Sequence, residues 1–218
     1  MNALDSRFIR RANCFAHRFS APGTFAYALS PLPSSFFAHH DEPPAQAVIV
    51  TAREDGGGTR HQYQITVSSV DGELRTRPAE LRVAVGDLVT WSGDKSVTFG
   101  FRIRGRIGDE VVDSASMRTE SIFTHAFGLP GTYEWADANG SGLRGQVRVR
   151  TLEASVGTEE WLSRLERGTL VHVRGERAEP QAVDILVGQT VVWAVEDAPG
   201  ISITDTALIP AGGTGAAT

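Results

Sequence analysis

Residues 15–28 read FAHRFSAPGTFAYA, and the pattern returns at residues 123–136 as FTHAFGLPGTYEWA. Phenylalanine, histidine, phenylalanine, a Pro-Gly-Thr turn and two aromatic residues recur in the same order, at an offset of 108 residues. Large side chains at alternate positions on both sides of a Pro-Gly turn are typical of two strand runs joined by a turn. The chain therefore contains an internal repeat made of strands.

A second repeated pair has an offset of 102 residues. Residues 78–91 read PAELRVAVGDLVTW, and residues 180–193 read PQAVDILVGQTVVW. Alternating apolar residues before a Gly-Asp or Gly-Gln turn predict two further strands. With this second pattern as the front half of a unit and the first as its back half, the chain runs back, front, back, front.

Composition indicates a globular protein that can bury a core. The chain has 218 residues, 41% of them hydrophobic, and a net charge of −5, which suits one large domain or two ordinary ones. The acidic balance argues against a nucleic-acid-binding protein. Cys14 is the only cysteine, so no intrachain disulfide forms. We expect neither a secretory signal nor a membrane span, and a cytoplasmic location.

Three segments differ from this strand pattern. Residues 53–59 are a glycine-rich linker by composition. Residues 158–167 predict a short helix, with a Thr158 cap, acidic residues in the first turn and Gly168 after the end. The tail at residues 211–218 is expected to be flexible.

Residues 81–149 resemble the cupredoxin family of plastocyanin and azurin. The likeness rests on the strand ending at Trp91, the Phe-x-x-Pro-Gly-Thr-Tyr-x-Trp motif that begins at Phe127, and the final strand at 145–149. The resemblance implies an all-β fold of two cupredoxin-like Greek-key β-sandwich domains. One short linking helix, within residues 153–168, is expected between them.

The resemblance also implies where copper ligands would stand. The family uses a histidine upstream and then cysteine, histidine and methionine in one loop. In this sequence those positions fall on Phe99, Asp137, Gly140 and Leu143. A blue-copper site requires the thiolate, so we expect no cofactor and no redox activity. The expected function is a non-catalytic structural or binding protein, a subunit or accessory component of a larger assembly.

The order of the halves leaves two ways to complete the units. Residues 60–152 form a central domain under this interpretation, and residues 1–52 and 169–210 form a second, split domain assembled from both chain termini. Pairing within the chain is favoured by the high effective concentration of the partner half. The alternative is pairing between chains, in which complementary half-units of successive copies produce rings or filaments.

A few side chains outside the copper positions are further candidates. His39 and His40 are the weak basis of an alternative function, the handling of copper or zinc through histidines. Phe36 and Phe37, in a proline-rich loop, are either a plug over the end of a sandwich or an anchor for a protein partner.

Two other groups of polar residues receive structural interpretations. His17 and His125 occupy equivalent places in the repeat, and we expect half-buried strand residues with hydrogen-bond partners. Asp109, Glu110 and Asp113 are expected to form a solvated acidic loop.

Overall fold

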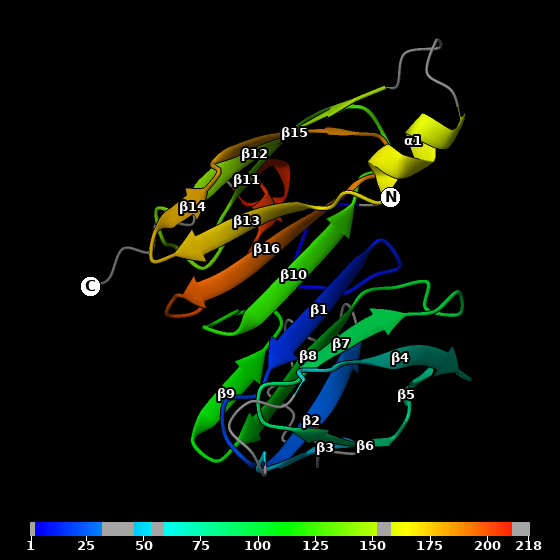
Figure 1. Cartoon of the computed structure of the whole chain (residues 1–218), viewed down its shortest axis with the longest axis vertical. Coiled ribbons are helices and arrows are strands. Elements are labelled where there is room, and N and C mark those ends of the chain that lie inside the picture. The colour runs from blue at the N-terminus through cyan, green and yellow to red at the C-terminus, as the bar shows by residue number, and fades with distance from the viewer. Residues whose placement is uncertain (1–2, 32–45, 54–58, 152–157, 211–218) are drawn as a thin grey trace.

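A computed structural model describes residues 3–31, 46–53, 59–151 and 158–210. The fold is all-β, as predicted, and its strands form three mixed sheets, of eight, five and four strands (Figure 1). The helix α1 (Thr158–Leu165) and a 3-10 turn, η2 (Thr206–Leu208), are the helical elements of the described part.

The largest sheet runs the full length of the molecule, in the order β14-β13-β16-β10-β1-β7-β4-β5. Its strands are β1 (Asn13–Arg18), β4 (Gln62–Val70), β5 (Glu73–Arg77), β7 (Leu88–Gly93), β10 (Ser121–Ala126), β13 (Thr169–Arg174), β14 (Arg177–Glu179) and β16 (Thr190–Asp197).

Two smaller sheets lie behind it. The five-stranded sheet has the order β6-β3-β2-β8-β9 and the four-stranded sheet the order β15-β12-β11-β17. Their strands are β2 (Gly23–Pro31), β3 (Gln46–Thr51), β6 (Glu80–Ala84), β8 (Phe101–Ile107) and β9 (Glu110–Asp113), and β11 (Gly131–Ala136), β12 (Arg144–Arg150), β15 (Ala182–Leu186) and β17 (Thr204–Asp205).

Aromatic side chains fill the space between the layers. The ring of Trp91 on β7 packs edge-on against that of Tyr27 on β2, with 5.7 Å between centroids. In the other half, Trp193 on β16 meets Trp135 on β11 in the same manner at 6.0 Å. All four rings are almost fully buried. Each Pro-Gly turn therefore carries the chain from the long sheet to a smaller one, and the molecule is two sandwiches that share one sheet.

The strand pairing corrects the expected division of the chain. The first back half pairs with the front half that follows it, since β3 runs parallel to β6 and β1 pairs with β7. The second pair of halves repeats this, with β12 parallel to β15 and β10 beside β16. Neither the split domain of residues 1–52 and 169–210 nor the central domain of 60–152 matches this pairing. Halves that adjoin in sequence close a shorter loop at a lower entropy cost.

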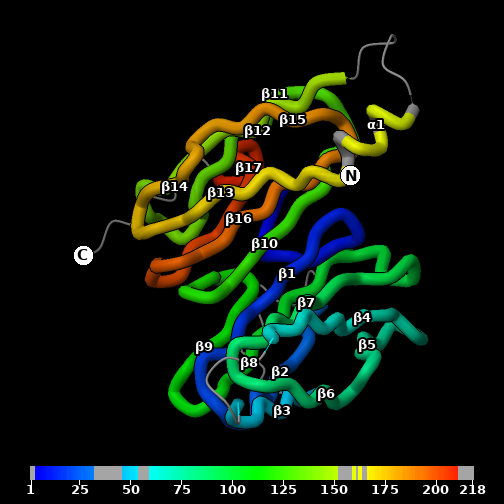
Figure 2. The backbone as a smooth tube through the Cα atoms, in the orientation of Figure 1, coloured from blue at the N-terminus to red at the C-terminus, as the bar shows by residue number. Residues whose placement is uncertain are grey.

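The two sandwiches meet edge to edge at β1 and β10 (Figure 2). Phe15 is the repeat equivalent of Phe123 and is also its cross-strand partner. The junction therefore has a local two-fold axis at this pair, as an isologous dimer interface does. The nine strands β1 to β9 lie on one side, and β10 and its successors on the other.

A short segment before β1 connects the sandwiches a second time. Ser6 N–H donates to Ile203 O at 2.9 Å, and Ile203 N–H donates to the Ser6 hydroxyl at 2.8 Å. A few residues later, Ile9 and Phe101 exchange backbone hydrogen bonds. The first contact is made to the C-terminal sandwich and the second to the N-terminal one, so this N-terminal strap holds both.

The segment before β10 is the two-fold equivalent of this strap. Ser114 N–H donates to Ile103 O at 3.0 Å, and Ile103 N–H donates to the Ser114 hydroxyl at 3.1 Å. Met117 then exchanges backbone hydrogen bonds with Ile201. This second strap also holds both sandwiches. In the described part, each sandwich is therefore completed by segments of the same molecule.

Candidate functional site

The position of the family's copper-binding cysteine is a hydrogen-bonded carboxylate. Asp137 follows β11 and is buried. Its Oδ1 accepts from the backbone N–H groups of Asn139 at 2.9 Å and Ser202 at 2.7 Å, and from the Ser202 hydroxyl at 3.1 Å. Its Oδ2 accepts from Ser141 N–H at 3.1 Å. These donors stabilise the buried negative charge without a metal.

The remaining copper positions do not converge on Asp137. Gly140 is exposed with a φ of +100°, and Leu143 is buried in the core. Phe99 precedes β8 in the other sandwich, so it is not the upstream position for this loop. The segment from Gly200 to Ser202 lies against the Asp137 loop in place of Phe99. It belongs to the same sandwich, because β10 to β17 form one sandwich, and Ser202 N–H donates to Asp137.

The weaker candidates from the sequence lie elsewhere. Phe36, Phe37, His39 and His40 fall outside the described residues. Within residues 3–31, 46–53, 59–151 and 158–210, no three His, Cys, Asp or Glu side chains are grouped so as to hold a metal ion. The described part also has no helix with the length and apolar character needed to cross a bilayer.

His17 is a polar connection at the junction of the sandwiches. The imidazole is buried on β1, with Nε2 3.2 Å from Oε1 of Glu110 on β9. Its Nδ1 lies 3.5 Å from the buried Ser121 hydroxyl on β10. Serine, histidine and glutamate in series resemble a nucleophile and its base, but the Ser121 side chain is 2% exposed and no described pocket reaches it. The series therefore joins strands and does not form an active site.

His125 has the same place on β10 and a different environment. Its Nδ1 is buried without a hydrogen-bond partner among the described residues. Burial, with a further contribution from the positive charge of Arg10, lowers the pKa of His125 to about 4. The imidazole is therefore neutral at physiological pH. Both histidines are fully buried and not half-buried as expected. His17 has a hydrogen bond at Nδ1, but its Nε2, like Nδ1 of His125, has no hydrogen-bond partner among the described residues, although it lies within ion-pair distance of Glu110.

The expected acidic loop is only partly solvated. Asp113 is buried, and its carboxylate accepts from the Arg102 guanidinium, Nε being 2.8 Å from Oδ1. A backbone N–H of Ala115 donates to the same oxygen at 2.9 Å. Asp113 is thus part of the second strap, because the next residue, Ser114, is hydrogen-bonded to Ile103.

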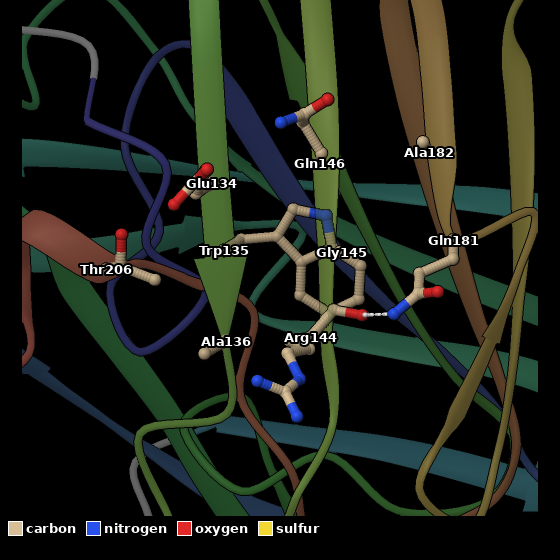
Figure 3. Close-up of a pocket in the computed structure, with 9 residues that line it drawn as sticks. All are labelled: Glu134, Trp135, Ala136, Arg144, Gly145, Gln146, Gln181, Ala182 and Thr206. Carbon is tan, nitrogen blue, oxygen red and sulfur yellow. Dashed lines mark hydrogen bonds between the residues drawn. The ribbon is translucent and has the colours of Figure 1, made fainter.

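A hollow of about 550 Å³ lies on the outer face of the four-stranded sheet (Figure 3). Small residues at Ala136, Gly145 and Ala182 form its floor, and Glu134 and Arg144 lie at its rim. A Cβ atom at Gly145 would lie 2.5 Å from the Trp135 ring, so the wide indole requires glycine there. Trp135 itself is almost fully buried, so the hollow exposes little of its ring.

The outer face of the eight-stranded sheet is the most distinctive surface of the molecule. Figure 1 looks onto its strands, and no described helix or strand lies across them. Although Arg18, Glu196, His172 and Arg174 lie further along the same side of the sheet, the outward side chains in the middle of six adjacent strands are uncharged. We name this set the uncharged face: Leu170 of β13, Val192 and Ala194 of β16, Ile122 and Thr124 of β10, Cys14 and Ala16 of β1, Thr90 and Ser92 of β7, and Gln64 and Thr66 of β4.

The strand registers place these residues in two cross-strand rows. One row passes through Val192, Thr124, Cys14 and Ser92. The other passes through Ala194, Ile122, Ala16 and Thr90, in the same order of strands. Both rows cross the junction of the sandwiches without interruption. Most of these side chains are short, so few of them project far from the sheet.

Charges gather on the other outer faces. The five-stranded sheet exposes arginines at alternate positions of β8, namely Arg102, Arg104 and Arg106. The four-stranded sheet exposes Arg148 and Arg150, which pair with Asp184 at 3.5 and 3.1 Å. Solvent-facing β-surfaces usually carry such polar residues. The absence of charge from the uncharged face therefore distinguishes it from the rest of the described surface.

Cys14 lies near the centre of the uncharged face. Burial raises the pKa of its thiol, against a smaller lowering effect of a hydrogen bond with Thr124. The side chain is partly exposed. A protonated thiol of this kind is a poor nucleophile, but as the single cysteine it is a specific chemical probe for this surface.

No family model, no curated protein and no solved structure matches this chain. Its function must therefore be argued from its own surfaces and sites. The uncharged face is the functional feature that sequence reasoning missed. A signal was present in part, because the outward positions of the strand at residues 13–18 carry cysteine and alanine. The residues that lie beside this cysteine and alanine on the next strand depend on the pairing of β1 with β10, which the repeat alone does not specify.

Proposed function

We propose that the chain is a non-catalytic, copper-free cupredoxin-like protein that binds a protein partner, as a structural or accessory component of a larger assembly. The observation that carries this proposal is the uncharged face. A continuous and charge-depleted surface is the composition of the core of a protein interface. Its position across both sandwiches means that a partner would contact the two halves at once.

The degenerate copper loop supports the non-catalytic part of the proposal. The carboxylate of Asp137 is satisfied by backbone and hydroxyl donors. Hydrogen bonds therefore hold this loop in shape, whereas bonds between the metal and its ligands would hold it in a copper site. The cupredoxin-like relationship itself rests on the strand and turn motifs of each half, here with the back half preceding the front half.

Site-specific photo-crosslinking tests the proposal. Benzoylphenylalanine at Gln64, an exposed position of the uncharged face, is compared with the same group at Thr132 on the outer face of the four-stranded sheet. In an extract of the native cells, we expect a discrete adduct from position 64 and none from position 132. Adding Thr124→Arg to the position-64 variant should abolish the adduct. Equal adducts from both positions would refute binding through this face.

A further inference from the structure

We infer that the occupant of the uncharged face is a second copy of this chain, packed sheet on sheet. The inference rests on the proposed function, because it names the partner of the same surface. Sheets with short outward side chains can stack at about 10 Å. The uncharged face has such side chains across six strands.

Charge complementarity selects the second copy among the described surfaces. The other two outer faces carry Arg104, Arg106, Arg148 and Asp184, whose charged groups would lose their hydration if they were buried against an uncharged surface. The uncharged face imposes no such cost on another uncharged face. Within the described residues, the surface that matches it in the absence of charge is therefore the same face of another molecule.

The charges at its border do not oppose this contact. Nη1 of Arg18 lies 3.6 Å from Oε2 of Glu120 at one end of β1. Glu196, beyond Ala194, is paired with both Arg174 and His172. Two identical surfaces repel each other if they carry excess charge of one sign. Here each border charge already has an opposite partner in its own chain.

The two halves of the face differ, and the difference gives an orientation. The β10–β16 half is apolar, with Ile122, Val192 and Ala194, whereas the β7–β4 half carries hydroxyl and amide groups such as Thr90 and Gln64. A two-fold axis in the plane of the interface, perpendicular to the strands, lays each half over its own copy. Apolar residues then bury one another, and polar residues meet polar residues.

The available area sets the strength of the association. Strands about 4.8 Å apart and one or two outward residues along each, about 6.8 Å apart, give a patch of roughly 360 Å² per copy. The total of about 700 Å² is below the size of stable specific interfaces and corresponds to a transient contact. The expected dimer is therefore weak and its population depends on concentration.

Sedimentation equilibrium of the full chain tests the inference. From about 1 µM to about 1 mM, we expect the mass to rise from 23.4 kDa toward twice that value. Thr124→Arg should weaken dimerisation at least tenfold. Thr132→Arg, the same change on the opposite layer, should leave it unchanged. Alkylation of Cys14 should slow as the dimer forms, because the thiol lies within the contact.

The outcomes separate the inference from the proposed function. A monomer at all concentrations, or equal dimerisation of the Thr124→Arg variant, overturns the second copy as occupant. If the position-64 crosslink then captures a different protein, the face still binds a partner and only its identity was wrong. If that crosslink captures nothing, both the inference and the proposed function fail.

Discussion

The two sandwiches share a scaffold but differ in their buried polar groups. Trp91 and Trp193 each pack edge-on against an aromatic ring at the equivalent repeat position, Tyr27 and Trp135. Gly86 and Gly188 have the same left-handed turn, with φ of +89° and +92°. Some buried polar positions correspond as well, such as Ser6 and Ser114, but others do not. The N-terminal sandwich has Leu29 where the C-terminal one has Asp137 with its four hydrogen bonds. Packing and turns alone are therefore enough to specify the sandwich, and interior polar residues can diverge.

The largest expected effect tests whether Asp137 supports its sandwich through hydrogen bonds. Asp137→Leu, the residue of the other half, leaves the buried N–H of Ser202 and the partly buried N–H of Asn139 without an acceptor. We expect a loss of about 3 kcal/mol in the free energy of unfolding, measured by urea denaturation.

Asp137→Asn is the matched control for that substitution. Its amide oxygen can keep the three bonds made to Oδ1, and only the donor at Ser141 loses its acceptor. We expect a loss of about 1 kcal/mol. Equal losses for the two variants would show that charge, and not the number of acceptors, stabilises the loop.

A smaller effect is expected from the buried His125. The pKa of His125 is lowered to about 4 in the folded state, from an ordinary value of 6.5. As the pH falls, the unfolded chain therefore takes up this proton first, and stability decreases between about pH 6.5 and pH 4. The contribution of this one group between pH 7 and pH 5 is about 2 kcal/mol.

His125→Leu removes that contribution. The variant should lose about 2 kcal/mol less than the natural chain on going from pH 7 to pH 5, by urea denaturation at each pH. His61→Leu, at an exposed histidine, should leave the pH dependence unchanged. A pH dependence that is identical in the natural chain and the His125→Leu variant would mean that His125 is protonated in the folded state as readily as in the unfolded one.

The fold class followed from the sequence because its signals are local. Period-two patterns around Pro22-Gly23 and Gly86-Asp87 mark strands and turns within a few residues. The pairing of the halves was wrong because it depends on contacts between segments tens of residues apart. A further local signal, the Asp-Ser pair at residues 5–6, repeats at 113–114. This pair marks the start of each strap.

The candidate site was less predictable than the fold. The absence of a thiolate at residue 137 could be read from the sequence, since residue identity alone decides it. The network around the carboxylate could not, because Ser202 is distant in sequence. The uncharged face likewise requires the register between β1 and β10. Uncharged outward residues on one strand are common, and only their alignment over six strands gives a surface.

The smallest effect tests the equivalence of the two straps. Ser6 and Ser114 are fully buried, and each hydroxyl accepts from an isoleucine N–H, at 2.8 and 3.1 Å. Ser6→Ala and Ser114→Ala each leave that buried donor unpaired, so we expect similar losses of about 1 kcal/mol. Ser20→Ala, at an exposed position, should change the free energy of unfolding by less than about 0.5 kcal/mol. Ser114→Ala could instead lower the free energy of unfolding while Ser6→Ala leaves it unchanged. In that case the covalent link through residues 110–120 would hold the sandwiches together, and the N-terminal strap would contact them without stabilising them.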